Sequence, residues 1–391
     1  MNDAQTIRQS INKYYLFEFL IDCAFFGPVI LVFWQRNGLS FTQIMMLQAS
    51  YALTSTLLEL PTGAFADHIG KKISLMIGAL FFSAGCFWYG FSHTFWQFFL
   101  GELITGTGMA FISGADRAYI HQLLCSEKRG HEFSRIDGRS RGLSQIAVAL
   151  SSVLGGLIGS VSLGLTLIAT SAVTFVGFLV GASFPKVKVT QESGTKPNLL
   201  QTIYESIKII KHSPTLLWLT LFFAFFNALI WPLQLFAQAY LLHLQIPISL
   251  FGIIFMVFNL VAAGGLALTH WYERLTKKHV FMIMSVAVVI ALFLLGRFPS
   301  IYLFPLWLCF IVFGIMSQTI ISSRVLRIAP AHRTATILSF QSMLRRILYA
   351  GIGPMFGFTI DKLGMPVALQ LYALAASLIL GGLLMFKGKE I

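Results

Sequence analysis

The amino-acid sequence predicts an all-α membrane protein with twelve transmembrane helices in two pseudo-symmetric six-helix bundles. Of its 391 residues, 56% are hydrophobic and 11% are charged, and 37 are phenylalanine. A single aqueous core cannot bury that much apolar surface. The apolar residues form runs of about twenty, the length a helix needs to cross the roughly 30 Å hydrocarbon layer of a bilayer.

Twelve such runs follow one another along the chain, and a polar stretch divides them into two sets of six. We expect an N-terminal bundle over residues 1–184, a cytoplasmic linker over 185–213 and a C-terminal bundle over 214–391. In the linker, the apolar residues of 198–212 share one face, which predicts an amphipathic helix at the membrane surface. The predicted spans are 14–35, 41–62, 73–92, 95–123, 137–159, 162–184, 214–242, 249–270, 280–296, 299–322, 334–359 and 365–386.

The net charge of +13 comes from basic residues whose distribution along the chain indicates the membrane topology. With the N-terminus inside, 22 of the 28 Lys and Arg residues fall on the cytoplasmic side, and Arg36, Arg297 and Lys362 fall opposite. The positive-inside rule therefore predicts cytoplasmic N- and C-termini, and the basicity calls for no nucleic-acid partner. The polar start, Met1 to Lys13, predicts no cleavable signal peptide. The four cysteines lack paired spacing, so we expect neither a disulfide nor a metal site.

A ten-residue motif stands between the second and third spans, where we expect a surface loop. It reads Gly63-Ala-Phe-Ala-Asp67-His-Ile-Gly70-Lys71-Lys72, and Asp67 is expected to interact with the positive end of the helix that begins near Lys71. The motif resembles the loop signature of the major facilitator superfamily, G-x-x-A-D-x-x-G-R/K-R/K. A weaker copy ends in Lys277-Lys278, with Glu273 at the position of Asp67.

The resemblance implies secondary transport by alternating access between two half-repeats. It implies no enzyme activity, and no cofactor beyond a proton gradient. We expect a monomer in the inner membrane of a bacterium, with the lipid bilayer and a small-molecule substrate as partners. Two departures limit what the resemblance implies. Glu102 stands where an arginine implicated in proton handling often precedes Gly106 and Gly108, and the fifth span lacks the antiporter Gly-Pro core, so the antiporter label is not supported.

Two acids lie in the first span. Glu18 and Asp22 are four residues apart, so both carboxylates face the same side of a helix. Repulsion between them favours the binding of a proton, as a coupling site requires. Alternatively, Glu18 is solvated at the cytoplasmic rim. Together with Glu102, these two acids are the candidates for proton coupling.

Further charges lie near the cytoplasmic ends of the spans. Asp116 and Arg117 are adjacent and point about 100° apart, so we expect each to pair with another helix or to face the transport path. Asp116 and Glu59 are also candidates for structural or gating contacts. Asp137 and Arg141 begin the fifth span, where Arg141 is deep enough to bind substrate or is simply a positive-inside residue.

Arg345 and Arg346 lie about ten residues into the eleventh span, and the C-terminal half holds no acid in the core of a span. Arginine keeps its charge and its planar fork suits carboxylate or phosphate, so the pair predicts an anionic substrate. A gate that pairs an arginine with an acid of the first half is the alternative. The expected substrate-binding residues are Arg345, Arg346, Arg141, Arg117, Tyr14, Asn227, Trp231, Gln234 and Gln341.

The sequence therefore predicts a proton-coupled carrier of a small organic anion, such as a polycarboxylate of the siderophore type. Proton-antiport efflux of lipophilic or cationic drugs is the alternative, since Asp22 and Glu102 can attract a cation and the many Phe and Met side chains can form an adaptable apolar wall. A membrane scaffold without transport is a third hypothesis, disfavoured because charges within spans are costly to insert.

Overall fold

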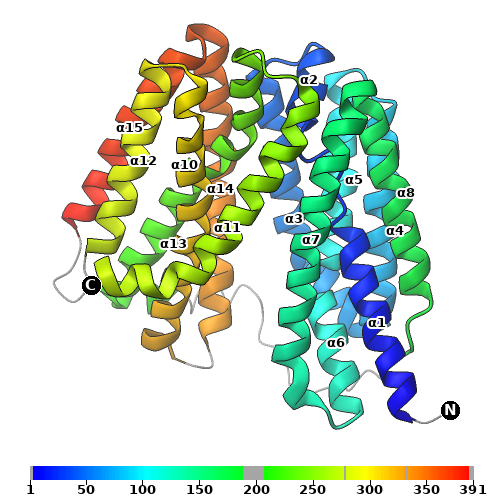
Figure 1. Ribbon diagram of the computed structural model, residues 1–391. Coiled ribbons are helices and arrows are strands. Elements are labelled where there is room, and N and C mark those ends of the chain that lie inside the picture. The colour runs from blue at the N-terminus through cyan, green and yellow to red at the C-terminus, as the bar shows by residue number, and fades with distance from the viewer. Residues whose placement is uncertain (1–2, 188–206, 277–278, 331–332, 387–391) are drawn as a thin grey trace. The chain divides into compact units, whose positions relative to one another are not determined.

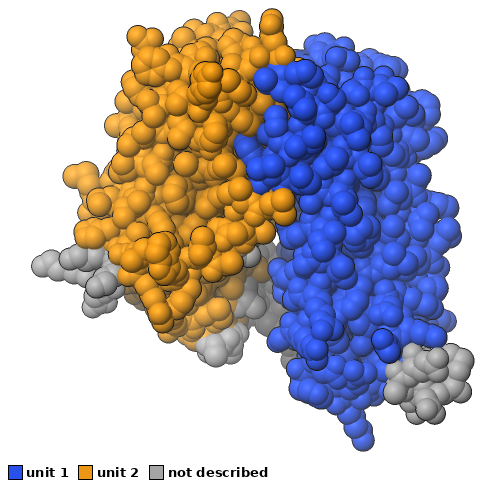
Figure 2. Space-filling model, in the orientation of Figure 1, with its two compact units in different colours: residues 1–39, 50–192, 246–259 blue, residues 40–49, 193–245, 260–391 orange. Residues whose placement is uncertain are grey.

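The computed structural model describes residues 3–187, 207–276, 279–330 and 333–386. Over these ranges the regular secondary structure is helical (Figure 1). Close contacts divide the chain into two compact units, which are coloured separately in Figure 2. Unit 1 comprises residues 1–39, 50–192 and 246–259, and unit 2 comprises residues 40–49, 193–245 and 260–391.

Each predicted span has a helical counterpart. Nine of the described helical stretches are long and apolar enough to cross a membrane, as judged from length and composition. The helices are α1 (Asp3–Ile21), α2 (Ile30–Arg36), α3 (Phe41–Ile69), α4 (Lys71–Gly90), α5 (Phe95–Ile112), α6 (Ala115–Ser126), α7 (Phe133–Val161), α8 (Leu163–Ala182), α10 (Pro214–His243), α11 (Ile248–Thr276), α12 (Val280–Arg297), α13 (Trp307–Ile328), α14 (Thr334–Leu363) and α15 (Met365–Met385), with 3₁₀ turns at Gly130–Glu132 and Ile301–Leu306.

Two continuous helices, α3 and α11, are each divided between the two units. Residues 41–49 of α3 belong to unit 2, whereas the rest of α3 belongs to unit 1. Residues 248–259 of α11 belong to unit 1, and the rest of α11 belongs to unit 2. The division of the sequence into halves at 185–213 stays a prediction. Most of the predicted linker helix lies outside the described residues, and its last part, 207–212, is helical.

The first span is broken rather than continuous. Helix α1 ends at Ile21 and α2 begins at Ile30, with Gly27 and Pro28 between them. In this break the backbone N–H of Phe25 donates to Thr170 Oγ1 of α8 at 3.1 Å. The carbonyl oxygen of Phe25 faces Gly155 of α7, where an added Cβ would lie 1.9 Å away. The break therefore depends on the absence of a side chain at Gly155.

Replacing Gly155 with alanine is expected to lower thermal stability, because the chain must move away from a methyl group that overlaps its backbone. Overpacking of this kind costs about 1–3 kcal/mol. Gly142, also on α7, is the matched control, because a Cβ there meets nothing within 4 Å. Gly142→Ala should raise stability by about 0.5–1 kcal/mol, since alanine favours the helix. Melting curves of the purified variants in detergent that shift in the same direction would contradict this packing.

The motif between the second and third spans is not the expected loop. Helix α3 continues through Gly63 and Asp67 to Ile69, and Gly70 alone forms the turn, with a φ of 108° that favours glycine. A Cβ added at Gly63 would meet no atom of a described neighbouring helix within 4 Å, so this glycine mediates no close helix approach. Asp67, in the last turn of α3, forms an ion pair with Lys71, the first residue of α4, and so lies at the N-terminal end of that helix.

The fourth span is also broken, at Gly114. Its φ of 80° ends α5 and allows α6 to begin at Ala115, which places Asp116 in the first turn of a new helix. A carboxylate is favourable at that position because the backbone N–H groups of a first turn have no partners within the helix. The backbone N–H of Arg117 donates to Asp116 Oδ1 at 2.7 Å.

Within unit 2, Asp361 holds the first turn of α3. The backbone N–H groups of Phe41 and Thr42 each donate to this carboxylate at 2.8 Å, and the Thr42 hydroxyl donates at 2.6 Å. Asp361 lies beyond the predicted span 334–359. Burial raises the pKa of its carboxyl, but the hydrogen bonds from Thr42 and Phe41 outweigh burial and hold the pKa below its ordinary value. The ionised carboxylate thus stabilises the start of α3.

Replacing Asp361 with alanine is expected to lower the melting temperature, with a loss of about 0.5–1 kcal/mol, the lower range for caps because the site is exposed. Because the folded-state pKa is depressed, this stabilisation is present above the ordinary Asp pKa of about 3.9 and is lost as the pH falls through the folded-state value. The gap between wild type and variant should therefore narrow under acidic conditions. Lys362→Ala is the neighbouring control, and a gap that is constant with pH would contradict the assignment.

Candidate transport site: a charge cluster and an arginine seam

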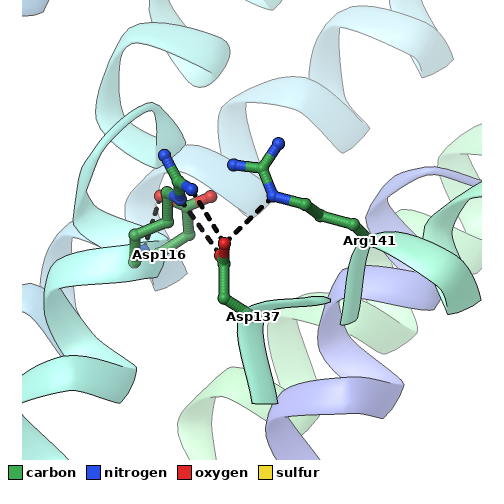
Figure 3. A network of polar contacts seen from close by, with 4 residues as sticks. Asp116, Asp137 and Arg141 are labelled. Atoms are coloured by element: carbon green, nitrogen blue, oxygen red, sulfur yellow. Dashed lines mark hydrogen bonds and ion pairs between the residues drawn. The ribbon is translucent and has the colours of Figure 1, made fainter. Parts of the chain in front are cut away.

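A cluster of charged residues lies in unit 1 where α1, α6 and α7 meet (Figure 3). Arg117 of α6 donates to Asp137 of α7 through Nε at 3.0 Å and Nη2 at 2.8 Å, and Arg141 Nε donates to the same carboxylate at 3.1 Å. Both guanidinium groups are well exposed, with 50% and 61% of the side-chain surface accessible, whereas Asp137 has 14%. The half-buried carboxylate of Asp137 therefore binds both arginines.

Glu18 of α1 completes this cluster. It interacts electrostatically with Asp22, Asp116 and Asp137, and its Oε1 is buried without a hydrogen-bond partner among the described residues. Asp22 directly follows the end of α1 and lies beside Ser144 of α7. Glu18 is therefore not a solvated rim residue, because the fold packs it against the acids of two other helices.

The charges of the cluster do not balance. Glu18, Asp22, Asp116 and Asp137 are four acids, and Arg117 and Arg141 are the two arginines that pair with one of them. In the described part of the chain, Glu18, Asp22 and Asp116 have no ion-pair partner within 4.0 Å. Adjacent carboxylates in a poorly hydrated site lower their repulsion by binding protons. This arrangement is chemically suited to taking up and releasing a proton.

A polar seam runs through unit 2 between α10, α13 and α14. On α10, Thr220, Asn227, Trp231 and Gln234 recur at the spacing of one helix face. Gln341 of α14 donates to Thr220 Oγ1 at 3.0 Å, and Asn227 Nδ2 donates to Ser317 Oγ of α13 at 3.2 Å. Gln234 and Asn227 both approach Gly314 of α13. Direct hydrogen bonds thus bind two of the four α10 side chains to the neighbouring helices.

Arg345 is the charged member of this seam. It follows Gln341 by one turn and precedes Tyr349 by another, on the same face of α14. Its Cζ lies 4.0 Å from the centroid of the Trp231 ring and 5.9 Å from that of Phe223. Its Nε is buried and has no hydrogen-bond partner among the described residues. Arg346, the next residue, is half-buried and turned about 100° away along the helix.

The acids described in unit 2 are engaged elsewhere. Glu273 of α11 accepts from Arg324 Nε at 3.2 Å and from Nη2 at 3.0 Å, and Asp361 binds the start of α3. Glu273, aligned with Asp67 in the sequence, thus pairs with α13, whereas Asp67 pairs with Lys71, the first residue of the next helix in the chain. Glu205, Glu390, Lys277 and Lys278 lie outside the described residues. Within described unit 2, Arg345 has an aromatic partner and no acidic one.

The remaining predicted residues occupy separate places. Tyr14 is 1% exposed and lies beside Ser140 in unit 1. Glu102 is 5% exposed and lies near Cys86 and Tyr89 of α4 rather than in the charge cluster. Lys72 donates to the carbonyl oxygens of Ala182 at 2.7 Å and Phe184 at 2.6 Å, so it binds the end of α8. Glu59 is exposed.

Sequence reasoning missed the partners of the predicted arginines. No partner was predicted for Asp137, although its spacing of four residues from Arg141 is typical of a helical ion pair. Tyr349 was also missed, although Gln341, Arg345 and Tyr349 repeat every four residues on α14. Arg117 and Arg141 both bind Asp137, so their predicted role in substrate binding competes with an ion pair that the protein already forms.

Comparison with known proteins places the chain in a family. The family described as Major Facilitator Superfamily matches residues 16–354.

Multidrug resistance protein 1 of Bacillus subtilis is 28% identical over 132 residues, which cover 34% of this chain and 31% of that protein. Quinolone resistance protein NorA of Staphylococcus aureus is 24% identical over 200 residues, half of each chain. An uncharacterized MFS-type transporter of Methanocaldococcus jannaschii is 24% identical over 145 residues, covering 37% of this chain and 36% of that one. The matches to these curated relatives thus span half of their length or less.

Solved structures share the whole fold. A mutant of the nucleoside transporter NupG has a TM-score of 0.84 at 14% identity, covering 98% of this chain and all of that one. A bacterial homolog of the human lysosomal transporter Spinster has a TM-score of 0.71 at 16% identity, covering 98% and 94%. At these identities the likeness shows the fold alone. With the family match over most of its length, the chain is an all-α multi-pass membrane protein of twelve spans that belongs to the major facilitator superfamily.

Proposed function

We propose that this protein is a proton-coupled secondary transporter that moves a small organic anion across a bacterial inner membrane by alternating access. The observation that carries the proposal is Arg345, whose buried Nε has no hydrogen-bond partner among the described residues while the described acids of its unit are engaged elsewhere. A permanent charge within a span is costly unless it has a partner or a function. An anionic substrate would supply the missing partner.

The charge cluster of unit 1 supports the coupling part of the proposal. Its carboxylates outnumber its arginines by two, so it can bind protons without requiring new counter-charges. We assign coupling first to Glu18 and Asp22, and we keep Glu102 as a separate candidate. The proposed substrate class includes a polycarboxylate of the siderophore type. We also propose that the transporter is a monomer with cytoplasmic termini.

Proton-antiport efflux of lipophilic or cationic drugs is the second candidate. The names of the matched relatives from Bacillus subtilis and Staphylococcus aureus favour it, as does the acidic excess of the charge cluster, which would attract a cation. The 37 phenylalanines and 13 methionines of the chain would provide an adaptable apolar surface. The two candidates differ in the charge of the substrate.

Proteoliposomes that contain a pH-sensitive dye separate the two candidates. We expect external citrate or tricarballylate, which do not cross lipid unaided, to drive proton flux in protein-containing vesicles and none in protein-free vesicles. Tetraphenylphosphonium and ethidium should be without effect. Proton flux driven by these cations and not by the carboxylates would reject anion transport in favour of efflux.

A further inference from the structure

Arg345 offers a ligand its edge rather than its face. The face is covered by Trp231, whose ring centroid lies 4.0 Å from Cζ. The edge carries the N–H donors; Nε is buried without a hydrogen-bond partner in the described chain, so a ligand reaches the guanidinium group through its terminal Nη donors. A guanidinium edge holds a carboxylate in the plane of the guanidinium group. The bound carboxylate therefore shares that plane.

An aromatic surface adjoins this edge. Trp231 is 38% exposed, although its neighbours Ile230 and Pro232 on α10 are buried. The Tyr349 ring lies 5.7 Å from the Trp231 ring at an interplanar angle of 40°. Tyr349 is 4% exposed, so the open indole alone provides the surface, which suits a flat, apolar group better than a hydrated one.

The number of charges at this edge limits the ligand. One guanidinium edge matches one carboxylate, and Arg346 is turned about 100° from Arg345 along α14, so the two edges are not aligned. The α10 residues on either side of Trp231 on this face are the neutral amides Asn227 and Gln234. Within the described part of unit 2, a second carboxylate on the same ligand would meet amide and aromatic groups of α10 rather than a second cation.

We propose that the Arg345 site takes a planar aromatic monocarboxylate, with the carboxylate on the guanidinium edge and the ring against the exposed indole of Trp231. In an aryl carboxylate the ring is conjugated with the carboxylate and prefers its plane, so ring and guanidinium become coplanar and the ring extends over the aromatic surface. This inference rests on the proposed anion transport and replaces the polycarboxylate with an aromatic monocarboxylate as the preferred substrate.

Isothermal titration calorimetry on the full-length protein in nanodiscs tests the proposal with four probes: 2-naphthoate, decahydro-2-naphthoate, naphthalene-2-carboxamide and citrate. We expect 2-naphthoate to bind about two- to tenfold more tightly than its saturated analogue, the advantage that aromatic pairing confers. The saturated acid is at least as apolar, so simple hydrophobic binding would favour it instead. The neutral carboxamide should bind more than tenfold more weakly than the carboxylate.

Variants assign the preference to one side chain. Trp231→Leu should bring the two naphthalene acids to similar affinity, Trp231→Phe should retain part of the preference, and Trp271→Leu, which removes an indole that is 61% exposed on α11, should leave it unchanged. Equal binding of the two acids by the wild type, or tighter binding of citrate, would overturn the aromatic inference while anion binding stands. Failure of all three anions to bind would overturn the proposed function itself.

Discussion

Replacing Arg345 with glutamine is expected to change anion binding and thermal stability in opposite directions. Anion affinity should fall by about tenfold or more, because hydrogen bonds to a charged group contribute about 1.5–3 kcal/mol. The ligand-free protein should become more stable. An arginine at the centre of a span costs about 2.5–3.5 kcal/mol on insertion scales, and stacking on Trp231 at 4.0 Å recovers only about 2 kcal/mol of this.

Arg324 provides the matched control for this prediction. It is also a half-buried arginine of unit 2, but it donates to Glu273 at 3.0 Å. Arg324→Gln should therefore lower stability, because it leaves Glu273 without its partner. Melting curves of the two variants, with and without 2-naphthoate, separate the two roles. If Arg345→Gln destabilises the ligand-free protein as Arg324→Gln does, Arg345 is a structural residue and the argument for an anionic substrate fails.

The double variant Glu18→Gln, Asp22→Asn is expected to lose proton-driven accumulation while retaining substrate exchange. Amides cannot release or accept a proton at neutral pH, and the replacements reduce the acidic excess of the cluster from two charges to none. The ion pairs of Asp137 with Arg117 and Arg141 remain, so the helices α6 and α7 should keep their contacts. Transport should then proceed only down the substrate gradient.

Counterflow and pH-driven uptake in the same proteoliposomes measure the two activities separately. Glu132→Gln is the control, because it removes an acid on the surface of unit 1 that pairs with Arg129 and leaves the charge cluster intact. The single variants of Glu18 and Asp22 show which carboxyl is required. Undiminished pH-driven uptake by the double variant would exclude Glu18 and Asp22 as coupling residues. If only Glu102→Gln abolishes pH-driven uptake, the coupling site is Glu102, the buried acid of α5 that lies near α4.

The sequence by itself determined the class, the spans and the family of this protein. Hydropathy is a property of contiguous residues, so each of the twelve runs was recognisable without knowledge of its neighbours in space. The cost of a charge within a span is equally local, and this is why Glu18, Asp22 and Arg345 could be selected as functional candidates from their positions alone.

Only the tertiary structure decided what those residues contact. Asp137 binds Arg117 across twenty residues of sequence, and Trp231 lies against Arg345 although more than a hundred residues separate them. The break at 22–29 likewise interrupts a run that remains apolar, because it depends on contacts such as that of Phe25 with Gly155. Partner choice between packed helices depends on their register and rotation, and neither hydropathy nor spacing along one helix specifies these.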